Sequence, residues 1–389
     1  MGRNIGSEIK DRIKQLILYT NPYNISRDVK KVAKKGYKES LKQKKRKIEY
    51  QEDYPVDFVV TWVNGSDPKW QNERAKYQPK DNSFNSEDNP ARYRYWDNLQ
   101  YWFRAVEQCA PWVRYIFFVT WGHIPSWLDT SNPKLKIIKH TDYIPSEYLP
   151  TFNSNVIELN FWRIPELSEH FVYFNDDVFL TFPVKKSDFF CNGFPSLNAI
   201  SKPIKYKLEM ASWDFSRFNN CRACNSKFDL KKVISKHPEK WFSYKYGKRI
   251  KYNLRTLEDG YLAGMNYPHT TFAFRKKQLE ACFRQFQDEF ELTFSHRFRN
   301  NQDLNLHIFD MWEMMHNTFE PSDNIGISLN LPFFIFERVK ISLNDSSIKC
   351  VCLNDGVGIE DSDFDGIKTS VNNLLNEKYP KKSSYESLE

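Results

Sequence analysis

Short apolar runs alternate along this chain with segments in which apolar residues recur at helical spacing. Four of the runs are short enough and apolar enough to be buried strands: residues 57–63, 115–120, 136–139 and 171–174. Between the first two runs, Leu99, Trp102, Phe103 and Val106 have the spacing of one helix face. Strands that alternate with helices predict parallel βαβ units. We therefore predict an α/β fold with a Rossmann-like layered core and a mostly parallel sheet.

The pattern weakens between residues 191 and 266, where Lys and aromatic residues mix without a clear period. We interpret this stretch as a helical or irregular insertion or lid. Helical spacing returns at residues 278–286 and 304–315. The predicted organisation is a basic N-terminal arm (1–50), a catalytic domain (51–360) and a C-terminal tail (361–389). In the tail we expect a short helix at 371–375 and frayed ends.

Composition favours a folded enzyme, because 40% of the 389 residues are hydrophobic and 16% are aromatic. The net charge of +8 is unevenly spread. The first 50 residues hold 15 Lys or Arg and 5 Asp or Glu, whereas the remainder holds 42 and 44. The basic character therefore belongs to the N-terminal arm.

Two features of the arm suggest contact with a membrane surface. Apolar residues Ile5, Ile9, Ile13, Leu16 and Ile17 share one helical face, and residues 30–47 form a dense basic run. A solvated arm and a helix packed on a partner protein remain alternatives, and nucleic acid binding is disfavoured. The sequence has no apolar run of 18 residues and no signal-peptide segment. We expect a cytoplasmic protein held peripherally on the inner face of the plasma membrane.

The seven cysteines are odd in number and scattered, which favours reduced thiols over a disulfide framework. Cys221 and Cys224 form the one CxxC pair. A structural zinc ion would need two more ligands, and Cys350 and Cys352 are the available pair. Thiols without a metal are the default interpretation.

The most informative candidate site follows the fourth predicted strand, where Phe174 is succeeded by Asn175, Asp176 and Asp177. Ligands of open α/β sheets bind at the carboxyl ends of strands, and paired carboxylates are typical ligands of Mg²⁺ or Mn²⁺. The alternative is structural, because Asp pairs also occupy turns and cap helices.

Other segments add polar groups that such a site could use. Asp57 opens the first strand and Asn64 lies in the loop after it, although that loop could equally be a simple turn. Asn155 and Glu158 come just before or within a predicted helix, and an N-cap at Ser154 or Asn155 would explain the segment structurally. One helix and one strand separate Glu158 from Asp177, so both could return to one sheet edge.

A titratable base and guanidinium groups come from later in the chain. His269 follows Pro268, and the segment 295–303 contains Arg299 and Asp303. Phosphoryl transfer needs positive groups for the diphosphate and a base for the attacking hydroxyl. A lone His is more often structural, so these residues gain weight only in combination with the Asn-Asp-Asp segment.

With these residues assembled, the chain resembles the Stealth family of hexose-1-phosphate transferases of capsule synthesis, which includes the animal lysosomal-enzyme N-acetylglucosamine-1-phosphotransferase. Four blocks carry the resemblance: residues 57–67, 92–180, 268–303 and the short block 352–355. It implies transfer of a sugar 1-phosphate from a nucleotide diphosphate sugar, with a UDP-sugar as the expected donor, to a hydroxyl of a capsular polysaccharide. The products would be a phosphodiester and a nucleoside monophosphate.

The resemblance also implies roles for individual residues. Catalytic roles fall on Asp57, Glu158, Asp177, His269 and Arg299, substrate binding on Asn64, Asn155, Asn175, Arg217 and Asp303, and Mg²⁺ or Mn²⁺ binding on Asp176 and Asp177. In the implied mechanism the metal sits on the diphosphate, Arg299 and Arg217 offset its charge, and His269 accepts the hydroxyl proton. Capsule-assembly proteins are further candidate partners. Two alternatives remain open: a metal-dependent glycosyltransferase that forms a glycosidic bond, and a non-catalytic polysaccharide- or membrane-binding scaffold.

Overall fold

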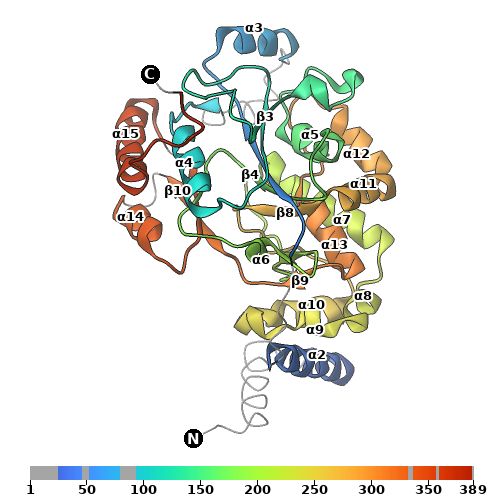
Figure 1. Ribbon diagram of the computed structural model, residues 1–389. Helices are drawn as coiled ribbons and strands as arrows, with labels where there is room; N and C mark the ends of the chain where they lie inside the picture. Colours follow the sequence, from blue (N-terminus) through green and yellow to red (C-terminus); the bar gives the residue numbers. More distant parts are fainter. Residues whose placement is uncertain (1–24, 46–51, 79–92, 332–335, 356–358, 388–389) are drawn as a thin grey trace, which may run out of the picture.

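A five-stranded sheet forms the centre of the protein (Figure 1), which we describe from a computed structural model. The structure describes residues 25–45, 52–78, 93–331, 336–355 and 359–387. The strands are β1 (Val56–Trp62), β2 (Ile116–Thr120), β3 (Leu135–Lys139), β4 (His170–Phe174) and β8 (Phe272–Arg275), in the order β3-β2-β1-β4-β8. All neighbours are parallel except β4 and β8. The predicted fold class and the four predicted strands are confirmed.

Side chains of the central strands alternate between two cores, as the two faces of a pleated sheet require. In β1, Val56, Phe58 and Val60 face one core and Val59 faces the other. Both faces are therefore covered, which explains the continuous apolar runs in the sequence. Because β1 is parallel to both β2 and β4, the carboxyl ends of these strands, which bear the functional loops, lie at one edge of the sheet.

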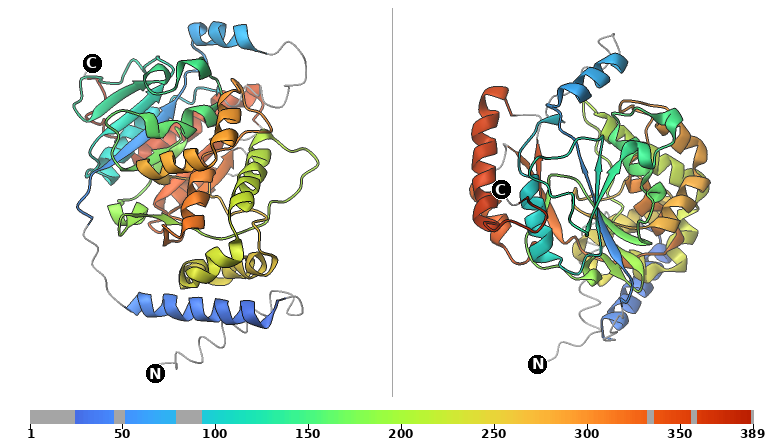
Figure 2. Two further views of the ribbon diagram at one scale, coloured as in Figure 1. Left: turned by 90° about the vertical axis from the view of Figure 1, so that its right-hand side faces the viewer. Right: turned by 45° about the horizontal axis from the view of Figure 1, so that its top comes forward.

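Helices on both sides complete a three-layer arrangement (Figures 1 and 2). One face is covered by α4 (Leu99–Cys109), α14 (Phe336–Asn344) and α15 (Asp361–Lys378). The other is covered by α5 (Ser154–Leu159), α7 (Ser212–Lys227), α11 (Lys276–Gln285), α12 (Gln287–Phe294) and α13 (His307–His316). The helix α3 (Pro68–Tyr77) follows β1, and α6 (Lys186–Phe189) is a single turn. Single 3₁₀ turns occur at His140–Asp142, Ser146–Tyr148 and Phe161–Arg163.

Two smaller sheets flank the centre. One joins β10 (Gly326–Leu331), β11 (Cys350–Asp355) and β5 (Val178–Leu180), and the other joins β6 (Phe190–Cys191), β7 (Phe194–Leu197) and β9 (Glu320–Pro321). The apolar residues after Asp177 therefore do not continue β4. They turn away from it and pair antiparallel with β11, which brings a segment 175 residues further along the chain against Asp177.

Most of the predicted insertion is helical. Besides α7 it contains α8 (Leu230–Lys236), α9 (Pro238–Trp241), a 3₁₀ segment η7 (Tyr244–Arg249) and α10 (Ile250–Asp259). Apolar residues of α7, α8 and α10 join the same core as α13, so this part of the segment packs on the domain rather than standing apart from it. The sequence pattern was weak because these helices are short and carry many polar residues.

The basic run of the N-terminal arm forms α2 (Arg27–Lys45), which lies along α9 and α10 at one end of the molecule (Figures 1 and 2). Its buried side bears Val29 and Tyr37, and Ile25, two residues before the helix, is buried as well. At Gly36 a Cβ atom would lie 2.3 Å from the carbonyl oxygen of Pro238, so the close approach of the two segments requires glycine. The predicted amphipathic helix at residues 5–19 lies outside the described residues.

The C-terminal segment differs from the expected frayed tail. The helix predicted at 371–375 extends over the whole of α15, and Val371 and Leu375 are buried. Beyond it, Arg104 donates two hydrogen bonds to the Glu386 carboxylate, at 2.8 and 2.6 Å. Few residues of this segment are buried, so its sequence is largely polar. The contacts of those few residues nevertheless attach it to α4. No helix of the described residues is both long and apolar enough to span a membrane.

Candidate active site

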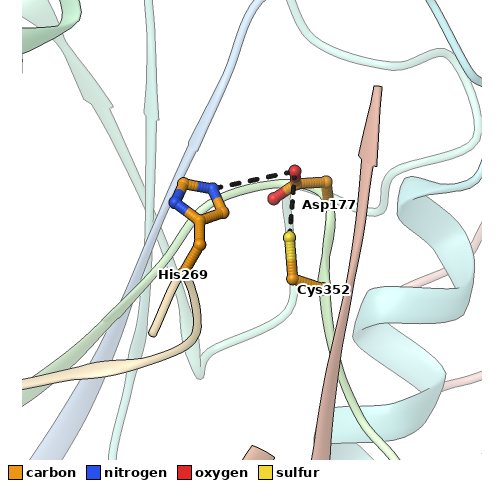
Figure 3. Close-up of side chains that lie close together, drawn as sticks. All are labelled: Asp177, His269 and Cys352. Atoms are coloured by element: carbon orange, nitrogen blue, oxygen red, sulfur yellow. Dashed lines mark hydrogen bonds and ion pairs between the residues drawn. The ribbon is translucent and has the colours of Figure 1, made fainter. Parts of the chain in front are cut away.

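The carboxyl end of β4 brings together an amide, a carboxylate and an imidazole, of which Figure 3 shows the carboxylate of Asp177 and the imidazole of His269. Asn175 Nδ2 lies 3.0 Å from His269 Nε2, and Asp177 Oδ2 lies 3.9 Å from the same nitrogen. His269 belongs to the segment just before β8, which pairs with β4. The side chain of His269 is 41% exposed, so a substrate can reach it.

Strand β11 supplies a third group to this site. The pairing of β5 with β11 sets Cys352 opposite Val178, and the Leu353 N–H donates to the backbone oxygen of Asp177 at 2.9 Å. The buried Cys352 thiol donates to Asp177 Oδ2 at 3.3 Å (Figure 3). One ligand atom each from Asp177, His269 and Cys352 lie within 4.8 Å of one another.

Strand β11 also supplies a second carboxylate, Asp355, near Asp177. Asp355 accepts a hydrogen bond from Trp96 Nε1 at 3.2 Å, and its other oxygen lies 3.8 Å from Arg94 Nη1. Burial raises the pKa of Asp355 to about 6, against the lowering effect of Arg94 and with a further increase from Asp177. The carboxyl ends of β4 and β11 thus form one acidic edge.

Asp176 adds to this acidic character. Its partial burial, followed by the neighbouring charge of Asp177, raises the pKa of Asp176 to about 7. A cation near Asp176 and Asp177 would favour the ionised form of Asp176 and offset the repulsion between the two carboxylates.

A second group of buried polar side chains surrounds Tyr173, near the end of β4. The Tyr173 hydroxyl donates to Glu158 Oε1 at 3.2 Å and lies 3.0 Å from Thr61 Oγ1. Burial raises the pKa of Glu158 to about 7, although Arg299 and hydrogen bonds from Tyr173 and Ser154 act in the opposite direction. Glu158 is therefore largely protonated below neutral pH.

Arg299 reaches the same group from the loop after α12. Its Nη2 donates to Ser154 Oγ at 2.7 Å, at the first residue of α5. The helix is capped by Asn153, whose side chain accepts from the Asn155 N–H at 3.1 Å. The N-cap therefore lies one residue before Ser154, the first of the two predicted positions.

Asp303 fastens the Arg299 loop to the start of α5. Its buried carboxylate accepts from Asn153 Nδ2 at 2.8 Å, from Asn155 Nδ2 at 3.2 Å and from the Asn300 N–H at 2.9 Å. It also lies 2.8 Å from His296 Nδ1. With its side chain fully buried, Asp303 acts by positioning the loop, and Asn155 contributes to that arrangement.

Asp57 lies at the opposite edge of the sheet. It pairs with Phe171, four residues before Asn175, which corresponds to about 13 Å along the strand. Arg114 donates to both of its carboxylate oxygens, at 2.8 and 2.6 Å, and the Ser168 N–H donates at 2.8 Å. The structure thus does not bring Asp57 to the other predicted residues. Its contacts join the starts of β1 and β2 to the turn before β4.

Asn64 does lie at the functional edge, after β1. Its side-chain oxygen accepts from the Ser66 N–H at 3.1 Å, and its backbone N–H donates to His123 Nε2 at 2.8 Å. His123 Nδ1 lies 3.2 Å from Asp67 Oδ2, so the ring carries its proton there. Burial lowers the pKa of His123, which keeps the ring neutral as this arrangement requires. The loop is thus an Asx turn held by a histidine that the sequence analysis missed.

Arg217 lies on α7, away from the contacts described so far. Its Nη2 donates to the Met265 backbone oxygen at 3.4 Å, and its guanidinium faces the rings of Trp213 and Tyr267. Tyr267 stacks on His307 with ring centroids 3.7 Å apart. Arg217 therefore supports the segment that leads to His269. Cys221 and Cys224 of the same helix are buried free thiols.

The donor atoms at Asp177 suit a divalent cation. Asp177 Oδ1 is buried and accepts no hydrogen bond from any residue within the described part of the chain. A buried carboxylate oxygen without a donor is destabilised unless a cation or water approaches it. The predicted ligands Asp176 and Asp177 fit Mg²⁺ or Mn²⁺ in their oxygen atoms.

Of the predicted residues, the structure gathers Asn175, Asp177 and His269 in one cluster and Glu158 with Arg299 in another. Tyr173 near the end of β4 and Asn175 just beyond it link the two clusters, since they are two residues apart in sequence. The structure also places Cys352 and Tyr173 in these clusters, although no role was predicted for either residue from the sequence. A signal existed for both, because Cys352 opens the fourth block and Tyr173 lies two residues before the Asn-Asp-Asp segment.

Comparisons with known proteins show the family of this chain. Three conserved regions of Stealth proteins match the chain: region 1 at residues 54–81, region 2 at 92–196 and region 3 at 268–307. A capsular polysaccharide phosphotransferase, WcwK of Streptococcus pneumoniae, is 39% identical over 329 residues, which cover 85% of this chain and 98% of that protein. The chain belongs to the Stealth family.

Further Stealth relatives have similar names. The exopolysaccharide phosphotransferase cps2G of Lactiplantibacillus plantarum is 34% identical over 85% of this chain and 95% of that protein. Among solved structures, the galactosyltransferase LgtC covers 82% of this chain and 95% of its own, with a TM-score of 0.37 and 8% identity. The family assignment rests on the sequence matches, and regions 1 to 3 contain the residues of both clusters except Cys352.

Proposed function

We propose that this Stealth protein is a hexose-1-phosphate transferase of capsular polysaccharide synthesis. Its donor would be a nucleotide diphosphate sugar, with a UDP-sugar expected, and its acceptor a hydroxyl of the growing polysaccharide. The acceptor oxygen attacks the phosphorus that carries the sugar, the bond between the two phosphoryl groups breaks, and a nucleoside monophosphate leaves. A phosphodiester joins the sugar to the acceptor.

The observation that supports this proposal most strongly is the position of His269 Nε2, 3.9 Å from Asp177 and 3.0 Å from Asn175. Phosphoryl transfer needs a proton acceptor next to the place where the diphosphate binds. The names of Stealth relatives, capsular and exopolysaccharide phosphotransferases, point to the same chemistry.

Asp177 and Asp176 would hold Mg²⁺ or Mn²⁺. When bound, the cation offsets negative charge on the diphosphate and its leaving oxygen. The carboxylates fix where the diphosphate lies relative to β4. Because Asp176 and Asp177 follow a strand that is buried on both faces, their backbone positions are rigid.

His269 accepts the proton of the attacking hydroxyl. The Asn175 amide nitrogen can only donate, so Nε2 is the acceptor and the ring proton resides on Nδ1. Nε2 thus has a lone pair directed toward the Asn175 and Asp177 side, where the acceptor would replace the amide contact. Asn175 keeps the ring in this tautomer before the substrate binds.

Arg299 is proposed to neutralise charge on the diphosphate. A largely neutral Glu158 leaves the guanidinium without a full counter-charge, so Arg299 remains available to an anionic substrate. Asn64 and Asn155 would contribute polar contacts or position the loops that make them. Asp57 is assigned a structural role, whereas Arg217 and Asp303 are proposed to support the substrate-binding segments.

Product analysis tests the proposal. The protein is incubated with a panel of nucleotide sugars, Mg²⁺ and a capsule oligosaccharide, and the products are followed by ³¹P NMR. A phosphodiester resonance together with a nucleoside monophosphate is expected. A glycosidic product with release of a nucleoside diphosphate would identify a glycosyltransferase instead. Failure to bind any nucleotide sugar would favour a non-catalytic scaffold.

We further propose that α2 holds the protein on an anionic membrane surface. The helix contains nine Lys or Arg and two Asp or Glu, and its apolar side is already occupied by α9 and α10. Its solvent-exposed side carries Arg27, Lys31, Lys34, Lys35, Lys38 and Lys42 at helical spacing. Such a face attracts anionic lipid electrostatically, without insertion of α2 itself.

A further inference from the structure

The active site contains a sulfur ligand that Mg²⁺ and Mn²⁺ chemistry does not explain. Mg²⁺ prefers oxygen ligands, whereas a thiolate, an imidazole and a carboxylate together are typical of Zn²⁺. We propose that Asp177, His269 and Cys352 form a Zn²⁺ site, and that Zn²⁺ bound there inhibits the enzyme by occupying His269 Nε2. The second part rests on the proposed transferase function.

Distances between the ligand atoms fit one small tetrahedral ion. Zn–S bonds of about 2.3 Å and Zn–N or Zn–O bonds of about 2.0 Å place tetrahedral ligands about 3.3–3.6 Å apart. Cys352 Sγ lies 3.3 Å from Asp177 Oδ2, and His269 Nε2 lies 3.9 Å from the same oxygen. All three ligand atoms lie within 4.8 Å, so only a small movement of the half-exposed imidazole closes the set.

The backbone holds two of the ligands in fixed register. Asp177 accepts the Leu353 N–H through its backbone oxygen, and Cys352 pairs with Val178 in the ladder between β11 and β5. The sulfur is buried, and the second oxygen of the Asp177 carboxylate, Oδ1, has no hydrogen-bond partner among the residues that the structure describes. Three protein ligands leave the fourth tetrahedral position for water, as in open zinc sites.

Binding of Zn²⁺ changes which side chains of the site carry or can accept a proton. Zn²⁺ takes the place of the Cys352 thiol proton, which is released to solvent, and the sulfur binds as thiolate. The His269 lone pair on Nε2 becomes a metal bond, so Nε2 can no longer accept a proton from the acceptor hydroxyl. Oxygen-bound Mg²⁺ leaves both the thiol and the imidazole unchanged.

Cobalt spectroscopy tests the site without measuring activity. The metal-free, full-length protein is titrated with Co²⁺, and we expect a thiolate-to-Co²⁺ charge-transfer band that one equivalent of Zn²⁺ removes. Cys352→Ser should abolish the band, whereas Cys350→Ala, which removes a buried thiol from the same strand, should keep it. Absence of the band in the wild type, or its persistence in Cys352→Ser, would overturn the metal site.

Inhibition is measured separately, as nucleoside monophosphate release at saturating Mg²⁺ with increasing Zn²⁺. We expect Cys352→Ser to need at least tenfold more Zn²⁺ for half inhibition than Cys350→Ala. Equal sensitivity of the two variants would refute inhibition through this site. If no metal supports turnover, the proposed function fails, while the cobalt titration still decides whether the site exists.

Discussion

The side-chain nitrogen of Asn175 lies 3.0 Å from Nε2 of His269 and sets the tautomer of that ring. An amide N–H₂ group offers only protons, so Nε2 presents its lone pair and Nδ1 carries the hydrogen. The two residues come from the end of β4 and from the segment before its antiparallel neighbour β8. Strand pairing therefore prepares a proton acceptor at the carboxyl edge of the sheet.

Replacement of His269 should remove this proton acceptor. We expect His269→Ala to lower kcat by a factor of about 10² to 10⁴, the usual contribution of general base catalysis, with a smaller effect on donor KM. The measurement is nucleoside monophosphate release under saturating Mg²⁺. His237→Ala is a matched control, since the two side chains are equally exposed at 41%. Unchanged kcat in His269→Ala would contradict the assignment.

Asp57 allows a test between a catalytic and a structural role. Asp57→Asn removes the charge that Arg114 and the neighbouring N–H groups bind, and we expect a loss of about 2–4 kcal/mol in the free energy of unfolding. Urea denaturation measures this loss, and the exposed Asp53→Asn is the control. The folded variant should keep kcat within about threefold of wild type, because Asp57 lies about 13 Å from the site along the strand. A fall in kcat of a hundredfold without destabilisation would restore the catalytic role.

The sequence was most informative about elements with strong periodicity. The buried strands β1, β2 and β4 are continuous apolar runs, and their carboxyl ends could be expected to share an edge, which placed Asn64 and Asn175 correctly. Asp57 opens the first strand, at the end opposite the carboxyl edge, and the catalytic role expected for it came from the family resemblance rather than from its position. Its role depends on Arg114, 57 residues away in sequence.

Contacts between segments that are distant in the sequence could not be predicted either. Nothing in the residues around Cys352 indicates that β11 pairs with β5, and that pairing alone brings the thiol to Asp177. The docked C-terminal segment was missed for a similar reason, since its attachment depends on the ion pair of Glu386 with Arg104. Local patterns predict elements, whereas these contacts depend on how distant elements meet.

The high pKa of Glu158 should appear as a pH dependence of stability. Burial raises its pKa from 4.5 to about 7, so between these values the folded chain holds a proton that the unfolded chain has lost. The contribution of this group therefore favours the folded state at low pH and declines as pH rises toward 7, by about 3 kcal/mol in total. Glu158→Gln has no such proton to lose.

Urea denaturation at pH 5 and pH 8 measures this effect. The stability of Glu158→Gln relative to wild type should increase from pH 5 to pH 8, and the exposed Glu147→Gln should show no such increase. A constant difference between Glu158→Gln and wild type would show that Glu158 ionises normally in the folded protein.

Membrane attachment through α2 should depend on its exposed lysines. Replacing Lys31, Lys34, Lys35 and Lys38 by Gln removes four charges from a face that makes none of the apolar contacts with α9 and α10. Each Lys near an anionic surface contributes about 1 kcal/mol, so binding to vesicles that contain anionic lipid should fall by up to about 10³-fold. Vesicle co-sedimentation at low and high salt measures the change, and wild-type binding should weaken with salt.

A control with four exposed lysines replaced elsewhere, Lys227, Lys231, Lys232 and Lys236, should bind as wild type does. If the two variants bind the vesicles equally well, attachment lies outside α2. Turnover of a soluble acceptor uses only the distant edge of the sheet, so the wild type and both variants should turn it over at the same rate.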